Sequence, residues 1–193
     1  MQSKLHMKEF VINLLINNLP LFYYYHTYEH TLYVIEKVVE IGQYENCTEP
    51  EIELLKAAAL WHDTGYINTY AGHEEESCML ARQYLPGYGY ATEDVNKICG
   101  MIMATKIPQS PKNKLEEIIA DADLEYLGTE HAAVLANNLF KELNALNPLV
   151  TQEAWNKTEI DFLTAHHYFT GYCKTNKEHI KQAYLKILID TKV

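Results

Sequence analysis

A histidine and an aspartate stand side by side at the end of an apolar segment, as His62 and Asp63 in the run LWHDTGY. Burying two such groups without partners costs free energy, and a shared metal ion would remove much of that cost. Upstream, the run YHTYEH supplies His26 and His30, and downstream the run ADADL supplies Asp123. The order His, His-Asp, Asp therefore predicts a metal-dependent hydrolase.

Three expected helices each place one of these groups on an apolar face, at the spacing of three and four residues that marks a single helix face. The stripes are His30 with Val34, Val38 and Ile41 over 27–43, His62 with Ile52, Leu55 and Ala59 over 50–63, and Asp123 with Leu115 and Ile119 over 112–124. Asp63 reaches the same place because Gly65 lets the chain turn just after the helix. We therefore expect the four side chains to meet around one ion.

Two imidazoles and two carboxylates suit Mn²⁺, Fe²⁺, Co²⁺ or Zn²⁺, with coordination positions left for water. A metal in such an open site lowers the pKa of bound water and provides hydroxide near neutral pH. Taken alone, His30 fits a hydrogen-bonded core histidine and the His62-Asp63 pair fits a helix end. The combination in this order favours the metal site.

Apolar spacing of three and four recurs along the chain, strand-like alternation is scarce, and proline or glycine breaks fall between the periodic segments. These features predict one all-α domain over residues 1–193, a bundle of about nine helices. The expected helices are 4–18, 27–43, 50–63, 74–85, 92–104, 112–124, 130–145, 152–167 and 176–191.

The formal net charge of −10 and the pI near 5.3 argue against a nucleic-acid polymer or an anionic membrane as partner. No segment approaches the roughly 20 apolar residues of a membrane span. The four cysteines are widely spaced and form no C-x-x-C motif, so we expect free thiols and a cytoplasmic location. The sequence leaves the oligomeric state open, and an oligomer is possible.

The pattern of His30, His62-Asp63 and Asp123 resembles the HD superfamily of metal-dependent phosphohydrolases, from about Tyr25 to Gly128. The resemblance implies an HD-like all-helical fold and hydrolysis of phosphate esters or anhydrides, often of nucleotides. It also implies that these four residues are the metal ligands. Asp121 competes with Asp123 for the last position; we prefer Asp123, which would leave Asp121 behind the ligands, orienting a histidine.

The same resemblance gives His26 the position of a proton donor to the leaving group, against the alternative of an exposed histidine at a helix start. Members that fully ligate two metals add two histidines between the doublet and the last aspartate. Only His73 lies in that interval here. One tightly bound ion is therefore expected rather than two, with Mg²⁺ added to the candidate metals.

Two further residues could contact the substrate. His73 follows Gly72 soon after the doublet and could line the pocket, although an ordinary helix start also explains the segment. Lys106 precedes Pro108 in a chain whose single arginine is Arg82, which makes it a candidate phosphate contact; the alternative is a solvated surface lysine.

The sequence thus predicts a phosphohydrolase for a small phosphorylated molecule, with nucleotides first. In this reading Asp63 and His26 carry the catalytic steps, and water attacks phosphorus. Two alternatives remain: a sensor domain that binds a metal or nucleotide without turnover, and an iron-dependent oxygenase. Turnover, or an oxygen-dependent spectral change, would distinguish them.

Overall fold

The structure, a computed structural model, describes residues 4–191. Within them it contains ten α-helices, three short 3₁₀ helices and no strand, which confirms the all-α prediction. The α-helices are α1 (Lys4–Asn18), α2 (Tyr28–Tyr44), α3 (Glu49–Trp61), α4 (His73–Tyr84), α5 (Thr92–Ala104), α6 (Lys114–Asp123), α7 (Ala132–Leu146), α8 (Gln152–Ala165), α9 (Gly171–Asn176) and α10 (Glu178–Asp190). The 3₁₀ helices are η1 (Thr64–Ile67), η2 (Leu85–Tyr88) and η3 (Glu125–Gly128).

The sequence predicted about nine helices, and the described residues contain ten. The additional helix is α9, which lies between the expected helices 152–167 and 176–191. At six residues, α9 is too short to show a helical repeat in the sequence. Its first turn is fixed by Thr170, whose hydroxyl accepts a hydrogen bond from the backbone N–H of Cys173.

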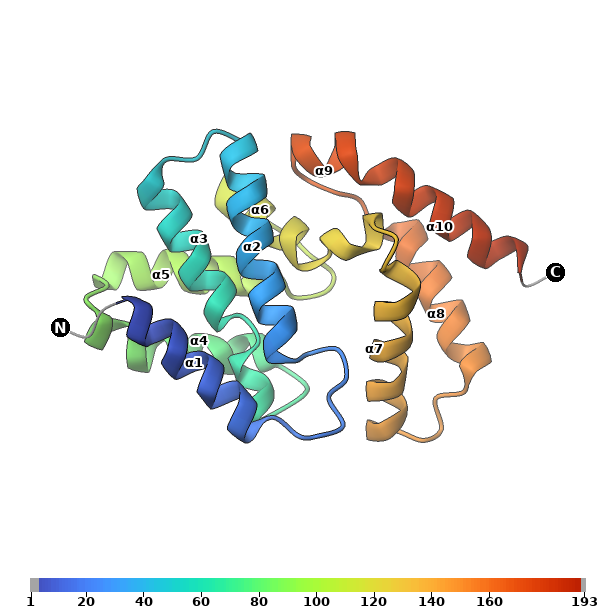
Figure 1. Cartoon of the computed structure of the whole chain (residues 1–193), viewed down its shortest axis with the longest axis horizontal. Helices are drawn as coiled ribbons and strands as arrows, with labels where there is room; N and C mark the ends of the chain where they lie inside the picture. Colours follow the sequence, from blue (N-terminus) through green and yellow to red (C-terminus); the bar gives the residue numbers. More distant parts are fainter. Residues whose placement is uncertain (1–3, 192–193) are drawn as a thin grey trace.

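Helices α1 to α6 form one half of the molecule, and α7, α8 and α10 form the other (Figure 1). Helix α2 lies at the centre and packs against α3 and α6. Its stripe of Val34, Val38 and Ile41 is fully buried, as the spacing predicted. Such burial is the main source of stability for helices of this length.

A second, smaller apolar cluster joins the two halves. It includes Tyr25, just before α2, and Leu124, just after α6, together with Leu163 of α8 and Leu185 of α10. The four cysteines are unpaired, as expected. None of the helices among residues 4–191 has the length and apolar character needed to cross a membrane.

Candidate metal centre

Three chain segments end or begin at the same place. His30 lies in the first turn of α2, whose start is capped by Thr27. His62 and Asp63 directly follow the last residue of α3, and Asp123 is the last residue of α6. Because each residue sits at a helix end, its side chain reaches past the helix into a common space.

The nitrogen and oxygen atoms of these side chains converge closely. His30 Nε2 lies 2.9 Å from Asp123 Oδ1 and 3.6 Å from Asp63 Oδ2. His62 Nε2 lies 3.1 Å from Asp63 Oδ2 and 3.5 Å from Asp123 Oδ1. One ligand atom each from His30, His62 and Asp123 fall within 4.8 Å of one another, a spacing that fits a metal ion.

Two of these atoms are buried without a hydrogen-bond partner among the described residues: His62 Nε2 and Asp63 Oδ2. The other imidazole nitrogen of His62, Nδ1, lies 2.8 Å from the Ala59 carbonyl, to which it donates. That hydrogen bond fixes the tautomer and directs the Nε2 lone pair toward the carboxylates. Buried polar atoms nearly always have partners, and a cation beside these two atoms, which lie 3.1 Å apart, would serve both.

The electric field at the centre also favours a cation. Burial lowers the pKa of His62, but the carboxylates of Asp63 and Asp123 outweigh it and hold that pKa well above its ordinary value. For Asp123 burial raises the pKa, yet the hydrogen bond to His30 and the nearby imidazole of His62 bring it down to about 2. The Asp123 carboxylate therefore stays ionised, and a divalent ion would compete with the proton for the imidazole of His62. The donor set therefore fits a divalent metal.

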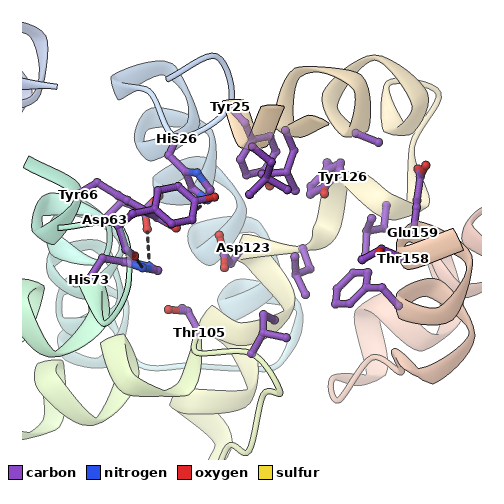
Figure 2. A pocket seen from close by; sticks show the side chains of 18 of the residues that line it. Tyr25, His26, Asp63, Tyr66, His73, Thr105, Asp123, Tyr126, Thr158 and Glu159 are labelled. Atoms are coloured by element: carbon purple, nitrogen blue, oxygen red, sulfur yellow. Dashed lines mark hydrogen bonds and ion pairs between the residues drawn. The ribbon is translucent and has the colours of Figure 1, made fainter. Parts of the chain in front are cut away.

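A cavity of about 280 Å³ opens beside the centre and runs between the two halves of the molecule (Figure 2). Asp63, His26 and His73 lie at one end, with Asp123 facing them. Thr158 and Glu159 of α8 lie at the other end. The centre is thus reachable by a small molecule bound in the cavity.

His26 lies in this cavity and is tied to α7. Its Nδ1 contacts Glu142 Oε1, and its backbone N–H donates to Glu142 Oε2 at 3.1 Å. Its Nε2 lies 3.1 Å from the Tyr66 hydroxyl. Burial lowers the pKa of His26, but the hydrogen bond to Glu142 and the nearby Asp63 raise it above its ordinary value. These contacts therefore favour the protonated imidazole of His26.

Glu142 was not foreseen among the site residues. It is fully buried, and it also accepts a hydrogen bond from the backbone N–H of Tyr25 at 3.0 Å. A usable signal was present in the sequence: Glu142 lies on the same helix face as Leu135 and Leu139, where a carboxylate needs a partner.

His73 and Lys106 have different placements. His73 lines the cavity, where its ring stacks on Tyr66 with centroids 3.8 Å apart and its Nε2 lies 3.7 Å from Asp63 Oδ1. Lys106 lines a separate groove, half exposed, and pairs there with Glu75 of α4. The structure brings His73 to the centre but not Lys106.

Asp121 and Asp123 point in different directions. The carboxylate of Asp121 accepts hydrogen bonds from the backbone N–H groups of Phe169 (2.9 Å) and Thr170 (2.8 Å) and from the Thr170 hydroxyl (2.6 Å). Two helical residues differ by about 200°, so Asp123 faces the centre while Asp121 faces α9. Asp121 therefore fixes the loop before α9, and the expected orienting bond to a histidine comes from the Ala59 carbonyl on His62 instead.

The buried cluster of histidines and aspartates in an all-helical fold is typical of metal-dependent hydrolases, and two comparisons with known proteins agree with this class. A family model described as HD domain matches residues 27–125. The crystal structure of a predicted HD superfamily hydrolase from an uncultured Thermotogales bacterium has a similar fold: TM-score 0.60, 19% identity, 95% of this chain and 88% of that chain covered. A search of curated proteins found no match.

The chain belongs to the HD domain family. It is thereby placed in a superfamily of metal-dependent hydrolases, whose members bind divalent metals, and His30, His62 and Asp123 offer a candidate site for one.

Gly65 allows the chain to pass close to α4 just after the doublet. A Cβ atom at this position would lie 2.0 Å from the His73 carbonyl oxygen and 2.8 Å from the Ser77 backbone nitrogen. We expect Gly65→Ala to lower the free energy of unfolding by about 3 kcal/mol, because α4 must shift to relieve the overlap. Thermal unfolding measures the change. Gly87→Ala is the matched control, since no atom lies within 4 Å of its added methyl group; equal melting temperatures for the two variants would contradict the prediction.

Proposed function

We propose that this protein is a metal-dependent phosphohydrolase for a small phosphorylated molecule. The observation that carries the proposal is the pair of buried, unpartnered atoms, His62 Nε2 and Asp63 Oδ2, beside a cavity that a small molecule can enter. His30, His62, Asp63 and Asp123 would hold one divalent ion, with Mn²⁺, Fe²⁺, Co²⁺, Zn²⁺ and Mg²⁺ as the candidates.

The reaction divides into steps that the described residues support. A divalent ion bound here supplies Lewis acidity and lowers the pKa of water. Water attacks phosphorus, the bond from phosphorus to the ester oxygen breaks, and inorganic phosphate and an alcohol are formed. Asp63 Oδ1 faces the cavity beside His73, where it can accept a proton or orient the substrate.

His26 would protonate the departing ester oxygen. Glu142 contacts His26 Nδ1 and stabilises the charged imidazolium, so that a proton is available at the other nitrogen, Nε2. The Tyr66 hydroxyl lies 3.1 Å from Nε2 and would yield to the substrate oxygen or help to orient it. Glu142 is thus proposed as a positioning residue and His26 as the general acid.

Nucleotides are one class of small phosphorylated molecule to test, because aromatic rings line the cavity, among them Tyr126, Trp155 and Phe162. His73 is proposed as a substrate contact. The acidic net charge makes a polymer a poor partner. The free cysteines are the reason to propose a cytoplasmic location.

A screen for phosphate release tests the proposal. The protein is stripped of metal, reloaded with each of the five ions, and assayed with nucleotides and simple phosphate esters. We expect release that requires an added ion and returns on reloading. A folded, metal-loaded protein that binds nucleotides but releases no phosphate would contradict the proposal and favour a sensor.

A further inference from the structure

The cavity has two ends of unlike chemistry. The metal end carries histidines and carboxylates. The opposite wall, formed by α7 and α8, carries Thr158 and Glu159 but is otherwise apolar, and we call its apolar part the apolar chamber (Figure 2). It comprises Ala136, Leu139, Leu143, Trp155, Phe162 and Leu163. A molecule that reaches the metal end with its phosphate therefore has its remaining part against these side chains.

The polar groups of the far wall are already engaged. The Thr158 hydroxyl donates to the Ala154 carbonyl of its own helix at 3.0 Å. Glu159 accepts a hydrogen bond from the Tyr184 hydroxyl. A ribose or a base edge placed here would find few free polar groups to replace its water, which costs free energy. An apolar group placed here gains free energy from burial.

The charge of the cavity restricts the phosphate as well. The described residues that line the cavity include no lysine or arginine. They include four residues with a carboxylate: Asp63, Glu74, Asp123 and Glu159. The cations that this end would offer a phosphoryl group are one bound divalent ion and the protonated His26. A di- or triphosphate would bring further negative charge next to carboxylates without a matching cation.

We infer that the substrate is a phosphomonoester with a small, largely apolar body that occupies the chamber; this inference rests on the proposed function. The cavity volume of about 280 Å³ lies near the lower end for small-molecule sites, so the body is small. Specificity would then come from α7 and α8, and chemistry from the ends of α2, α3 and α6.

Three esters of primary alcohols test the inference, because their leaving groups are chemically alike: n-hexyl phosphate, glycerol 1-phosphate and adenosine 5′-monophosphate. We expect kcat/KM for hexyl phosphate to exceed the other two by at least about 10-fold, the discrimination that a buried apolar group provides. Equal values, or a preference for the nucleotide, would overturn the inference while leaving the proposed function intact.

A variant locates the selectivity. Leu143 is half-buried and lines the chamber. We expect Leu143→Ala to lower the ratio of hexyl to glycerol kcat/KM by about 10-fold. Leu149→Ala, at a residue 86% exposed after α7, is the matched control and should leave the ratio unchanged. An unchanged ratio in Leu143→Ala would also overturn the inference.

A binding measurement tests the apolar chamber independently of the proposed hydrolase function. If no ester is cleaved with any ion, the proposed function is wrong, and calorimetry with the Mn²⁺-loaded protein still measures the chamber. Tighter binding of hexyl phosphate than of glycerol 1-phosphate, reduced in Leu143→Ala, would support the chamber by itself. Equal affinities would overturn it.

Discussion

Replacing Asp63 by asparagine is expected to lower metal-dependent phosphate release by more than about 1,000-fold, because the several kilocalories per mole that a correctly held ion contributes to the barrier are lost. The Oδ2 atom of Asp63 lies 3.1 Å from His62 Nε2 and 3.6 Å from His30 Nε2, and it is buried. An amide in its place carries no charge for the ion and brings an N–H group next to it. Phosphate release by the reloaded variant measures the effect.

Asp161→Asn is the matched control for this prediction, since Asp161 is an exposed aspartate on α8. It should retain the wild-type rate. Circular dichroism and thermal unfolding of both variants establish that they are folded. A folded Asp63→Asn protein with a rate within 10-fold of the wild type would show that Asp63 is not part of the reacting centre.

Replacing His26 by glutamine is the second prediction with a large effect. If His26 protonates the leaving oxygen, its loss should slow the hydrolysis of alkyl phosphates by about 100- to 10,000-fold, the range that general acids contribute. The loss should be much smaller for 4-nitrophenyl phosphate, because 4-nitrophenolate is a weak base that leaves without a proton. Rates for the two esters, measured on the same variant, separate an acid from a residue that only shapes the cavity. Equal losses with both esters would contradict the assignment.

Glu142→Gln tests the positioning of His26 through the pH profile. Burial lowers the pKa of His26, and Glu142 together with Asp63 raises it. The acid form is the active one, so the rate with alkyl phosphates should fall as pH rises through this pKa. Removing the charge of Glu142 lowers the pKa, and the fall should therefore begin at a lower pH. Glu130→Gln, at an exposed glutamate just before α7, is the control.

The helices and the helix face on which each candidate ligand lies could be predicted because that information is local; that the faces meet was inferred from the cost of burying the polar groups separately and from the family resemblance. The apolar stripe on α2 places His30, and the stripe on α3 places His62, whatever the rest of the chain does. Helix periodicity also distinguishes Asp123 from Asp121, whose carboxylate binds the loop before α9. These positions follow from spacing along one helix.

The remaining features depend on distant contacts. His26 and Glu142 are 116 residues apart, and no local pattern pairs them. Lys106 was a candidate phosphate contact because cations are scarce, with a surface lysine as the alternative; in the fold it lies in a separate groove and pairs with Glu75. The apolar chamber arises only when α7 and α8 pack across from the metal end (Figure 2). Helix α9 is too short to be recognised from its sequence.

The most direct test of the metal centre is a titration of the stripped protein with Mn²⁺ or Co²⁺, in which bound ion and phosphate release are measured on the same samples. We predict that one ion binds per chain, that activity rises in proportion to occupancy, and that Asp63→Asn binds the ion much more weakly. Full activity in the stripped protein, or Asp63→Asn binding as tightly as the wild type, would contradict a catalytic ion held by His30, His62, Asp63 and Asp123.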